Sequence, residues 1–261
     1  MLNWPDGRSY GATISFDFDA EEVWIGEDPE NAHRPGVLSQ GTYGPKVAIP
    51  LILELLKQHE ITATFFVPAR DAKRHPGRVQ EIIAAGHEIG HHGYTHRSPS
   101  ELSRAEEEEE LVHGLEGLRG LGADVVGYRS PSWDFSSSTL DLLVTHGFTY
   151  SSNLMDDLVP YRHSTHELVE VPVSWLLDDA PHFWFSAASW SKMIRSPDEV
   201  YAVWRSELDA IARLGDHFML TMHPQIIGRP SRLAMLDRLL TDIRESGAWI
   251  APARAVAELL T

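Results

Sequence analysis

The chain has 261 residues, a formal charge of −16 at pH 7 and no cysteine. A chain of this length can bury a full core without cross-links, and its 43% hydrophobic content is typical of a globular protein. Without cysteine it can form neither a disulfide nor a thiolate metal site. Because so acidic a surface repels phosphate backbones, no nucleic-acid partner is expected.

The N-terminal sequence lacks the features of a targeting or membrane segment. It has no basic stretch followed by a long apolar run, and no part of the chain approaches about 18 consecutive apolar residues. We therefore expect no signal peptide, no membrane partner and a cytoplasmic location. No internal repeat or composition shift divides the chain, so a single domain over residues 1–261 is predicted.

Short β-forming runs alternate with longer helical patterns in chain order. The predicted strands are Ala12–Phe18, Ile61–Val67, His87–His91, Val125–Arg129, Phe148–Tyr150, Val169–Val173, Phe218–Met222 and Ala248–Ile250.

Helix signals lie between these strands. Apolar residues at helical spacing from Ile49 to Leu56 predict an amphipathic helix. Ser-Pro-x-Glu sequences beginning at Ser98 and Ser196 predict capping boxes, and Glu106–Glu110 predicts a solvated helix face. Three glycines stand where helix-ending glycines belong: Gly86, Gly147 and Gly247.

Strands that alternate with helices predict an α/β fold with a parallel sheet, either an open doubly wound sheet or a closed barrel. Polar clusters follow several different predicted strands along the whole chain. In a barrel these strand ends converge on one face. The pattern therefore favours a distorted (β/α)7–8 barrel, similar to a TIM barrel.

The first polar cluster contains Asp17 and Asp19 at the end of the first predicted strand. Aspartates two apart in a strand point the same way, so both carboxylates could face one site. A surface turn with solvated acids explains the pair equally well.

The second cluster has four histidines within ten residues: His87, His91, His92 and His96. Neutral imidazole is the commonest metal ligand at neutral pH. The four-residue spacing of His92 and His96 lets two rings converge on one ion, whereas His91 with His96 is the less favourable pairing. A cluster without a metal is the alternative.

Two further clusters are weaker signals when taken alone. Arg129, Pro131 and Trp133 follow a predicted strand and could clamp a carboxylate and wall a pocket, but a loop ion pair explains them as well. His223 ends a late apolar strand, where a core histidine would be the more common explanation.

Together the four clusters resemble the polysaccharide deacetylase family, the NodB-homology or carbohydrate esterase family 4 hydrolases. Asp17 and Asp19 match the family's base and metal-binding aspartates, and His92 and His96 match its His-x-x-x-His motif. The order and separations agree from about residue 12 to residue 255.

The later motifs extend the resemblance. Arg129, Pro131 and Trp133 match Arg-x-Pro-x-aromatic, and His223 matches the last motif. The Asp-x-Asp form and the segments Gln40–Gly44 and Met222–Arg229 are similar to a branch that includes intracellular peptidoglycan-deacetylase-like proteins, cyclic imidases and allantoinases.

The resemblance implies a metal-dependent hydrolase of non-peptide C–N bonds. Asp19, His92 and His96 would hold a divalent ion, with zinc the first expectation and cobalt, nickel or manganese possible for the same donors. Asp17 would accept a proton from the attacking water, and His223 would protonate the leaving nitrogen.

Other site residues and the substrate are implied less directly. Arg129 would hold Asp17 ionised and oriented, and the substrate pocket is expected to include Tyr43 with Pro131 and Trp133. The substrate is either an N-acetylated sugar or a small cytoplasmic amide such as a cyclic imide or ureide. The branch implies a homo-oligomer, by analogy a tetramer, and a non-catalytic carbohydrate-binding protein is the alternative class.

Two features leave questions open. Ser151 stands where secreted members usually carry an Asp that orients the acid His, so Asp156 or Asp157 is expected to replace it. The aromatic segment Trp175–Phe185 could form either a lid or an oligomer contact. Five tryptophans could stack on sugars, wall a small pocket or pack subunits: Trp24, Trp133, Trp175, Trp184 and Trp190.

Overall fold

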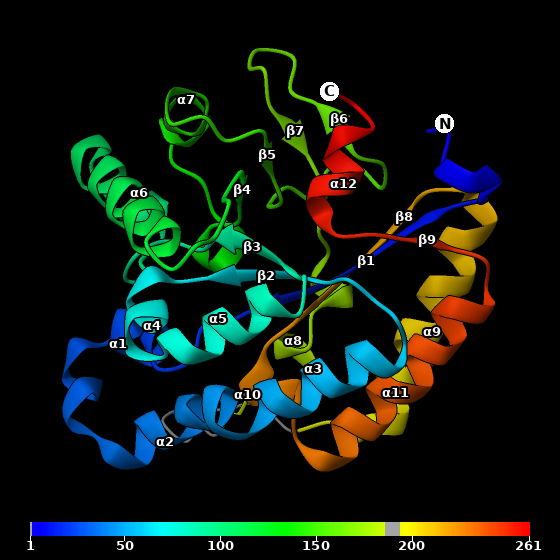
Figure 1. Cartoon of the computed structure of the whole chain (residues 1–261), viewed down its shortest axis with the longest axis horizontal. Helices are drawn as coiled ribbons and strands as arrows, with labels where there is room; N and C mark the ends of the chain where they lie inside the picture. Colours follow the sequence, from blue (N-terminus) through cyan, green and yellow to red (C-terminus); the bar gives the residue numbers. More distant parts are fainter. Residues whose placement is uncertain (1, 186–193) are drawn as a thin grey trace.

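The computed structural model describes residues 2–185 and 194–261 and contains a sheet curled into part of a barrel (Figure 1). The strand order is β6-β7-β5-β4-β3-β2-β1-β8, with β9 also paired to β1. All pairs are parallel except β6 with β7. The strands are β1 Gly11–Asp17, β2 Thr64–Val67, β3 Glu88–His91, β4 Gly127–Tyr128, β5 Tyr150–Ser151, β6 Tyr161–Arg162, β7 Val169–Glu170, β8 His217–Met222 and β9 Trp249–Ile250.

Helices cover the outside of this sheet, with α3, α9 and α11 side by side along one flank (Figure 1). The α-helices are α1 Glu22–Glu27, α2 Pro35–Tyr43, α3 Ile49–Gln58, α4 Ala69–Arg74, α5 Pro76–Ala84, α6 Arg104–Arg119, α7 Thr139–Thr145, α8 Ala180–Phe183, α9 Pro197–Leu214, α10 Pro224–Ile227, α11 Pro230–Glu245 and α12 Ala253–Glu258. The 3₁₀ turns are Pro5–Gly7, Pro29–His33, Pro99–Glu101, Pro131–Trp133 and Trp175–Leu177, and Gly44–Ala48 is a π-helical turn before α3.

The two-residue period of β1 separates an apolar layer from a polar one. Ile14 and Phe16 pack into the larger core cluster together with the helices. Ser15 and Asp17 point to the opposite, concave side, where both contact the buried guanidinium of Arg129. The alternation therefore puts reactive groups inside the curled sheet while the helices bury its outer face.

The predicted α/β barrel is confirmed in outline. The main strands lie where the sequence predicts them, although most are shorter, and β6 was not predicted. An isolated parallel bridge between Asp178 and Thr221 brings the segment after β7 back beside β8. No helix within the described residues has the length and apolarity needed to cross a membrane.

Helix boundaries follow the sequence signals with one error. The apolar stripe of α3 and the Ser196 capping box of α9 are confirmed. Ser98 does not cap α6: it precedes a short 3₁₀ turn, and the capping box is formed by Ser103 and Glu106. The three predicted helix-ending glycines follow α5, α7 and α11 with positive φ: Gly86, Gly147 and Gly247.

The prediction that Glu106–Glu110 forms a solvated face is wrong for two of its residues. Glu107 is buried and accepts hydrogen bonds from the hydroxyls of Ser136 and Thr139, each at 2.5 Å. Glu110 accepts bonds from the loop that carries His96. The acidic face of α6 packs against two loops, and these two carboxylates hold the loops in place.

Candidate active site

The carboxyl ends of four strands bring the predicted chemistry together. Asp17 is the last residue of β1, His92 follows β3, Arg129 follows β4 and His223 follows β8. Asp17, His92 and His223 line a cavity of about 430 Å³. That volume lies within the range of small-molecule sites.

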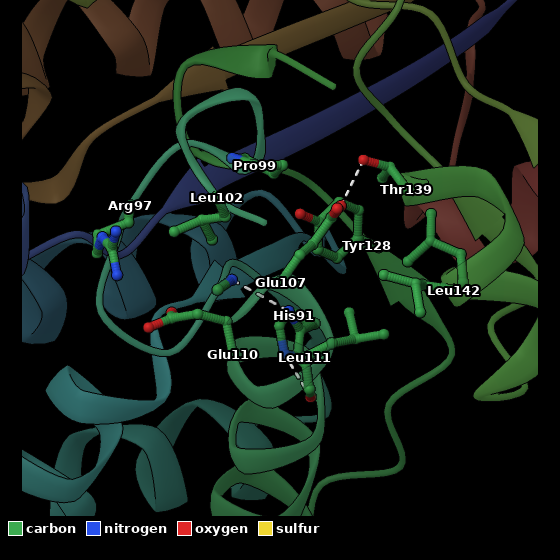
Figure 2. A pocket seen from close by; sticks show the side chains of 12 residues that line it. His91, Arg97, Pro99, Leu102, Glu107, Glu110, Leu111, Tyr128, Thr139 and Leu142 are labelled. Carbon is green, nitrogen blue, oxygen red and sulfur yellow. Dashed lines mark hydrogen bonds between the residues drawn. The ribbon is translucent and has the colours of Figure 1, made fainter. Parts of the chain in front are cut away.

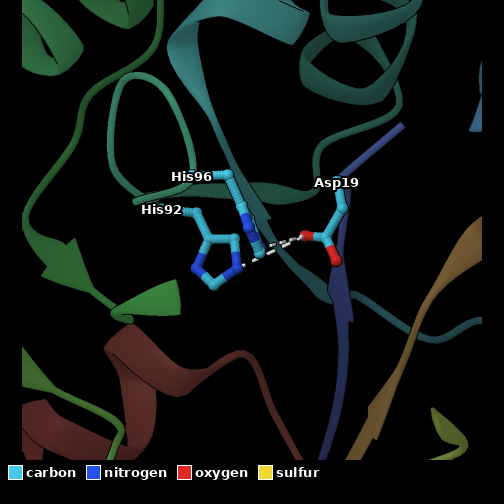
Figure 3. A group of neighbouring side chains, drawn as sticks. All are labelled: Asp19, His92 and His96. Atoms are coloured by element: carbon cyan, nitrogen blue, oxygen red, sulfur yellow. Dashed lines mark ion pairs between the residues drawn. The ribbon is translucent and has the colours of Figure 1, made fainter. Parts of the chain in front are cut away.

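Asp19 lies between three imidazoles. Its Oδ1 is 3.3 Å from Nε2 of His92 and 3.6 Å from Nε2 of His96, and its Oδ2 is 3.4 Å from Nε2 of His223. Figure 3 shows the rings of His92 and His96 directed toward this carboxylate. One oxygen and two nitrogens therefore converge on a single point.

Further contacts hold these two imidazoles in place. The Nδ1–H of His92 donates to the carbonyl oxygen of Arg129 at 2.8 Å, which leaves Nε2 directed at Asp19. His96 has a left-handed backbone with φ 55°, an uncommon conformation for a non-glycine residue. Glu110 fixes its loop by accepting bonds from the N–H groups of Tyr94 and Thr95 at 2.9 and 2.7 Å.

The donor set fits a divalent metal ion. Oδ1 of Asp19 is buried and has no hydrogen-bond partner among the described residues. Burial alone would raise the pKa of Asp19, but the surrounding imidazoles, His96 foremost, outweigh it and lower that pKa to about 2. Burial lowers the pKa of His96 to about 4, so its ring is neutral at pH 7. For His92, burial lowers the pKa, but the carboxylates of Asp17 and Asp19 outweigh it and raise that pKa above its usual value. A carboxylate oxygen with two imidazole nitrogens suits zinc and its first-row neighbours.

Asp17 and Arg129 form a buried ion pair next to this group. Nη1 of Arg129 donates to Oδ1 of Asp17 at 2.7 Å and to Oγ of Ser15 at 3.0 Å. The remaining guanidinium donors reach the carbonyl oxygen and hydroxyl of Ser152. Arg129 also lies 4.1 Å from the ring centroid of Phe66. Asp17 is thus held in one orientation with an oxygen facing the cavity.

His223 is oriented by Asp179, a residue that the sequence did not single out. Its Nδ1–H donates to Oδ1 of Asp179 at 2.6 Å, and its backbone N–H donates to Oδ2 at 3.0 Å. Burial would lower the pKa of His223, but the carboxylates of Asp179 and Asp178 outweigh it and hold that pKa well above its usual value. The imidazole is therefore a proton donor at neutral pH.

Neither Asp156 nor Asp157 plays this part, so that prediction is wrong. Asp156 accepts from the hydroxyl of Tyr161, and Asp157 accepts from its own loop. Ser151 donates its hydroxyl to the buried carboxylate of Glu170, away from His223. The signal for Asp179 lay in Trp175–Phe185, where two consecutive acids follow an apolar run.

The other two clustered histidines have structural roles. His87 accepts a bond from the N–H of Ala63 at 3.2 Å. His91 points away from Asp19, toward α6, where its Nε2 lies 3.1 Å from the carbonyl oxygen of Leu111 (Figure 2). The cavity around His91 holds about 10 Å³, room for one water at most. Burial lowers the pKa of His91 to about 3.

Two stacked tryptophan pairs contribute side chains to the cavity lined by Asp17, His92 and His223. Trp133 and Trp175 stack with ring centroids 4.4 Å apart, and both line it. Trp184 also lines it and stacks on Trp24 at 5.0 Å. Trp190 lies outside the described residues.

Of the three expected pocket residues, only Trp133 lines this cavity. Pro131 is buried and packs close to Gly93. Tyr43 lies under the guanidinium of Arg229 and donates its hydroxyl to the carbonyl of Gly228.

A curled parallel sheet with an Asp–Arg pair, an Asp–His₂ group and an Asp–His pair at its carboxyl edge defines a hydrolase-type site. The family model named polysaccharide deacetylase matches residues 42–151. The peptidoglycan deacetylase of Helicobacter pylori is 31% identical over 266 residues, covering 90% of each chain. The chain therefore belongs to the polysaccharide deacetylase family, whose enzymes hydrolyse non-peptide C–N bonds.

Solved structures agree with this assignment. A Mycobacterium smegmatis protein classed as a polysaccharide deacetylase is 39% identical with a TM-score of 0.95, covering 98% of this chain and 91% of that one. The Puue allantoinase is 21% identical with a TM-score of 0.86, covering 98% and 92% respectively. At 21% identity, the second similarity shows the fold alone.

Proposed function

We propose that this protein is a divalent-metal-dependent hydrolase that removes the acyl group from an N-acylated amino sugar or a comparably small amide. The observation that carries the proposal is the convergence of three carboxylate-centred groups on one cavity. Asp19 with His92 and His96 would hold the ion, and Asp17 and His223 stand beside it.

The base is Asp17. Water adds its oxygen to the carbonyl carbon of the amide, and the proton that it loses passes to the carboxylate of Asp17. Arg129 keeps that carboxylate oriented through the 2.7 Å bond to Oδ1. A positioned base of this kind contributes on the order of 10²–10⁴-fold in rate.

The acid is His223. As the C–N bond breaks, the Nε2–H of His223 donates its proton to the leaving nitrogen, so the products are a carboxylic acid and a free amine. Asp179 binds Nδ1 at 2.6 Å and therefore fixes which nitrogen faces the cavity. When bound, the metal ion would polarise the carbonyl and stabilise the developing negative charge.

The test is the release of acetate and free amine by the zinc-loaded protein from a panel of N-acetylated chito-oligosaccharides and peptidoglycan fragments. We expect turnover that disappears after chelation and returns with added zinc, cobalt, nickel or manganese. Turnover that persists unchanged after the bound metal has been removed would contradict the proposal.

A second candidate, hydrolysis of a cyclic imide or ureide, is favoured by the size of the cavity. A volume of about 430 Å³, lined by the stacked Trp133 and Trp175, matches the size of a small ring compound. Allantoin and simple cyclic imides therefore belong in the same panel. Activity on these compounds with none on acetylated sugars would select this candidate.

We also propose that the enzyme acts in the cytoplasm as a homo-oligomer. Exposed apolar side chains support the second point, among them Leu158, Trp175, Leu176 and Ile194 at 41–54% exposure. Cell fractionation tests the location, and analytical ultracentrifugation tests the assembly. A monomer at micromolar concentration would contradict the oligomer.

A further inference from the structure

A second pocket lies behind the tryptophan wall of the catalytic cavity. It has a volume of about 280 Å³ and lies between α2, α8, α10 and the start of α11. Its lining is aromatic and apolar on one side, with Trp24, Phe183 and Trp184, and polar on the other, with Gln225, Arg229 and Arg232. Trp184 lines both pockets, so one indole separates them.

Aromatic stacking holds both arginines of this pocket in place. The guanidinium of Arg229 lies 3.7 Å from the ring centroid of Tyr43, and that of Arg232 lies 4.4 Å from Phe183. One donor of Arg232 also binds the carbonyl oxygen of Ile226 at 2.9 Å. Both side chains are half-buried, so their positions are fixed by packing.

Neither arginine forms an ion pair with a carboxylate of the described chain. The ion pairs found there include none to Arg229 or Arg232, although the chain has 38 acidic residues against 22 basic ones. Residues 186–193, which lie outside the described part, contain no Asp or Glu. In so acidic a protein, two neighbouring arginines without a carboxylate partner are not explained by a shortage of acids.

The surroundings leave positive charge uncompensated. Burial lowers the pKa of Arg232, Asp179 raises it in part, and the charge of Arg229 lowers it further. Asp179 is already hydrogen-bonded to His223. The amide of Gln225 is buried without a hydrogen-bond partner among the described residues. This wall therefore has unused hydrogen-bonding capacity as well as unpaired charge.

The catalytic cavity has the opposite character. Four carboxylate residues line it, and none of its described lining residues is Lys or Arg: Asp17, Asp19, Glu27 and Asp178. The guanidinium groups that would attract an anionic group therefore line the neighbouring pocket. Trp184 thus separates a cavity lined by several carboxylates from a pocket lined by two arginines.

We propose that the pocket of Arg229 and Arg232 binds the carboxylate group of a small organic acid. Guanidinium groups bind carboxylates through two parallel hydrogen bonds, and the aromatic wall accommodates an apolar body behind the carboxylate. The acid is either a separate ligand or part of a substrate whose acyl group lies in the catalytic cavity. The proposal concerns binding, so it can be tested whether or not the catalytic proposal holds.

The test is calorimetric titration of the full-length protein with butanoate, with the neutral butyramide of similar shape and with inorganic phosphate. We expect butanoate to bind more tightly than phosphate, and butyramide not to bind. Arg229→Gln and Arg232→Gln should each weaken butanoate by about 10-fold or more, the usual effect of losing a charged hydrogen bond. Arg238→Gln is the matched control, because Arg238 lies on the same helix and pairs with Asp198 outside the pocket.

Arg229→Lys separates charge from geometry and guards against misfolding of the Gln variants. It keeps the charge without the planar fork, so we expect an intermediate affinity. Equal binding of butyramide, or an affinity unchanged in all the pocket variants, would overturn the proposal. Competition by butanoate against a carboxylate-bearing amide, but not against a neutral one, assigns the pocket to substrate, and binding without such competition assigns it to a separate ligand.

Discussion

Two carboxylate–cation pairs face each other across the site, with nearly equal contact distances and different chemistry. Arg129 approaches Asp17 at 2.7 Å, and His223 approaches Asp179 at 2.6 Å. In the first pair the guanidinium holds the carboxylate in place, and the carboxylate is the group that takes up a proton. In the second pair the imidazole of His223 is the group that releases a proton. The two pairs share a contact distance and differ in which member exchanges a proton: the carboxylate of Asp17 accepts one, and the imidazole of His223 donates one.

The largest effect is expected from removing the base. Asp17→Asn should reduce kcat by on the order of 10²–10⁴-fold while leaving bound metal unchanged, because the amide accepts no proton and Asp17 is not a ligand. Steady-state kinetics with metal analysis check this. Asp19→Asn is the matched variant and should lose metal. If Asp17→Asn loses the metal instead, Asp17 is the metal ligand and Asp19 is the base.

Arg129→Lys tests whether the first pair needs only charge. The ammonium cannot reproduce the four polar contacts of the guanidinium, so the orientation of Asp17 is lost while the positive charge remains. We expect a fall in kcat of about 10–100-fold, the loss typical of misplaced catalytic groups. The pH profile should keep its alkaline limb. A profile shifted on that side would show that Arg129 also acts on His223.

Asp179→Asn addresses the second pair. The carboxylates beside His223 raise its pKa, so removing one lowers it and the imidazolium is lost at a lower pH. The alkaline limb of kcat against pH should therefore move to lower pH, and the loss of rate should be greater at pH 9 than at pH 6. Asp157→Asn is the control, because within the described residues the hydrogen bonds of Asp157 go to its own loop. An unmoved limb would remove Asp179 from its positioning role.

The smallest effect on catalysis is expected at Ser151. Ser151→Asp restores the residue expected from secreted relatives, yet it places a second buried carboxylate against Glu170. We expect no gain in rate and a lower Tm, by about 2–4 °C for each kcal/mol lost in a chain of this size. Thermal denaturation with Ser151→Ala as control checks this. A faster Ser151→Asp variant would mean that Asp179 does not fully orient His223.

The sequence predicted the groups that lie at strand ends. Asp17, His92, Arg129 and His223 each lie at or directly after the end of a strand, and the parallel sheet brings those ends together. Asp179 escaped prediction because it stands in an irregular segment that joins the sheet through one bridge at Asp178. Local periodicity carries no information about such a contact.

The unpaired arginines escaped prediction for a related reason. Arg229 ends a segment that resembles the branch, Met222–Arg229, and Arg232 was not singled out, because a missing partner becomes visible only in three dimensions. Tyr43 was expected in the catalytic pocket because of the motif around it, and it instead supports Arg229. Short motifs thus indicate a region of the fold more reliably than the direction of each side chain.

Backbone amides in two parts of the site are expected to exchange hydrogen at different rates, because their N–H groups are held differently. Asp17 ends a central strand whose neighbours β2 and β8 pair with it on both sides. Its amide should exchange only through global unfolding. The loop amides of Tyr94 and Thr95, held by one carboxylate on α6, should exchange by local opening. Exchange mass spectrometry should therefore record motion of the His96 loop while the base remains protected.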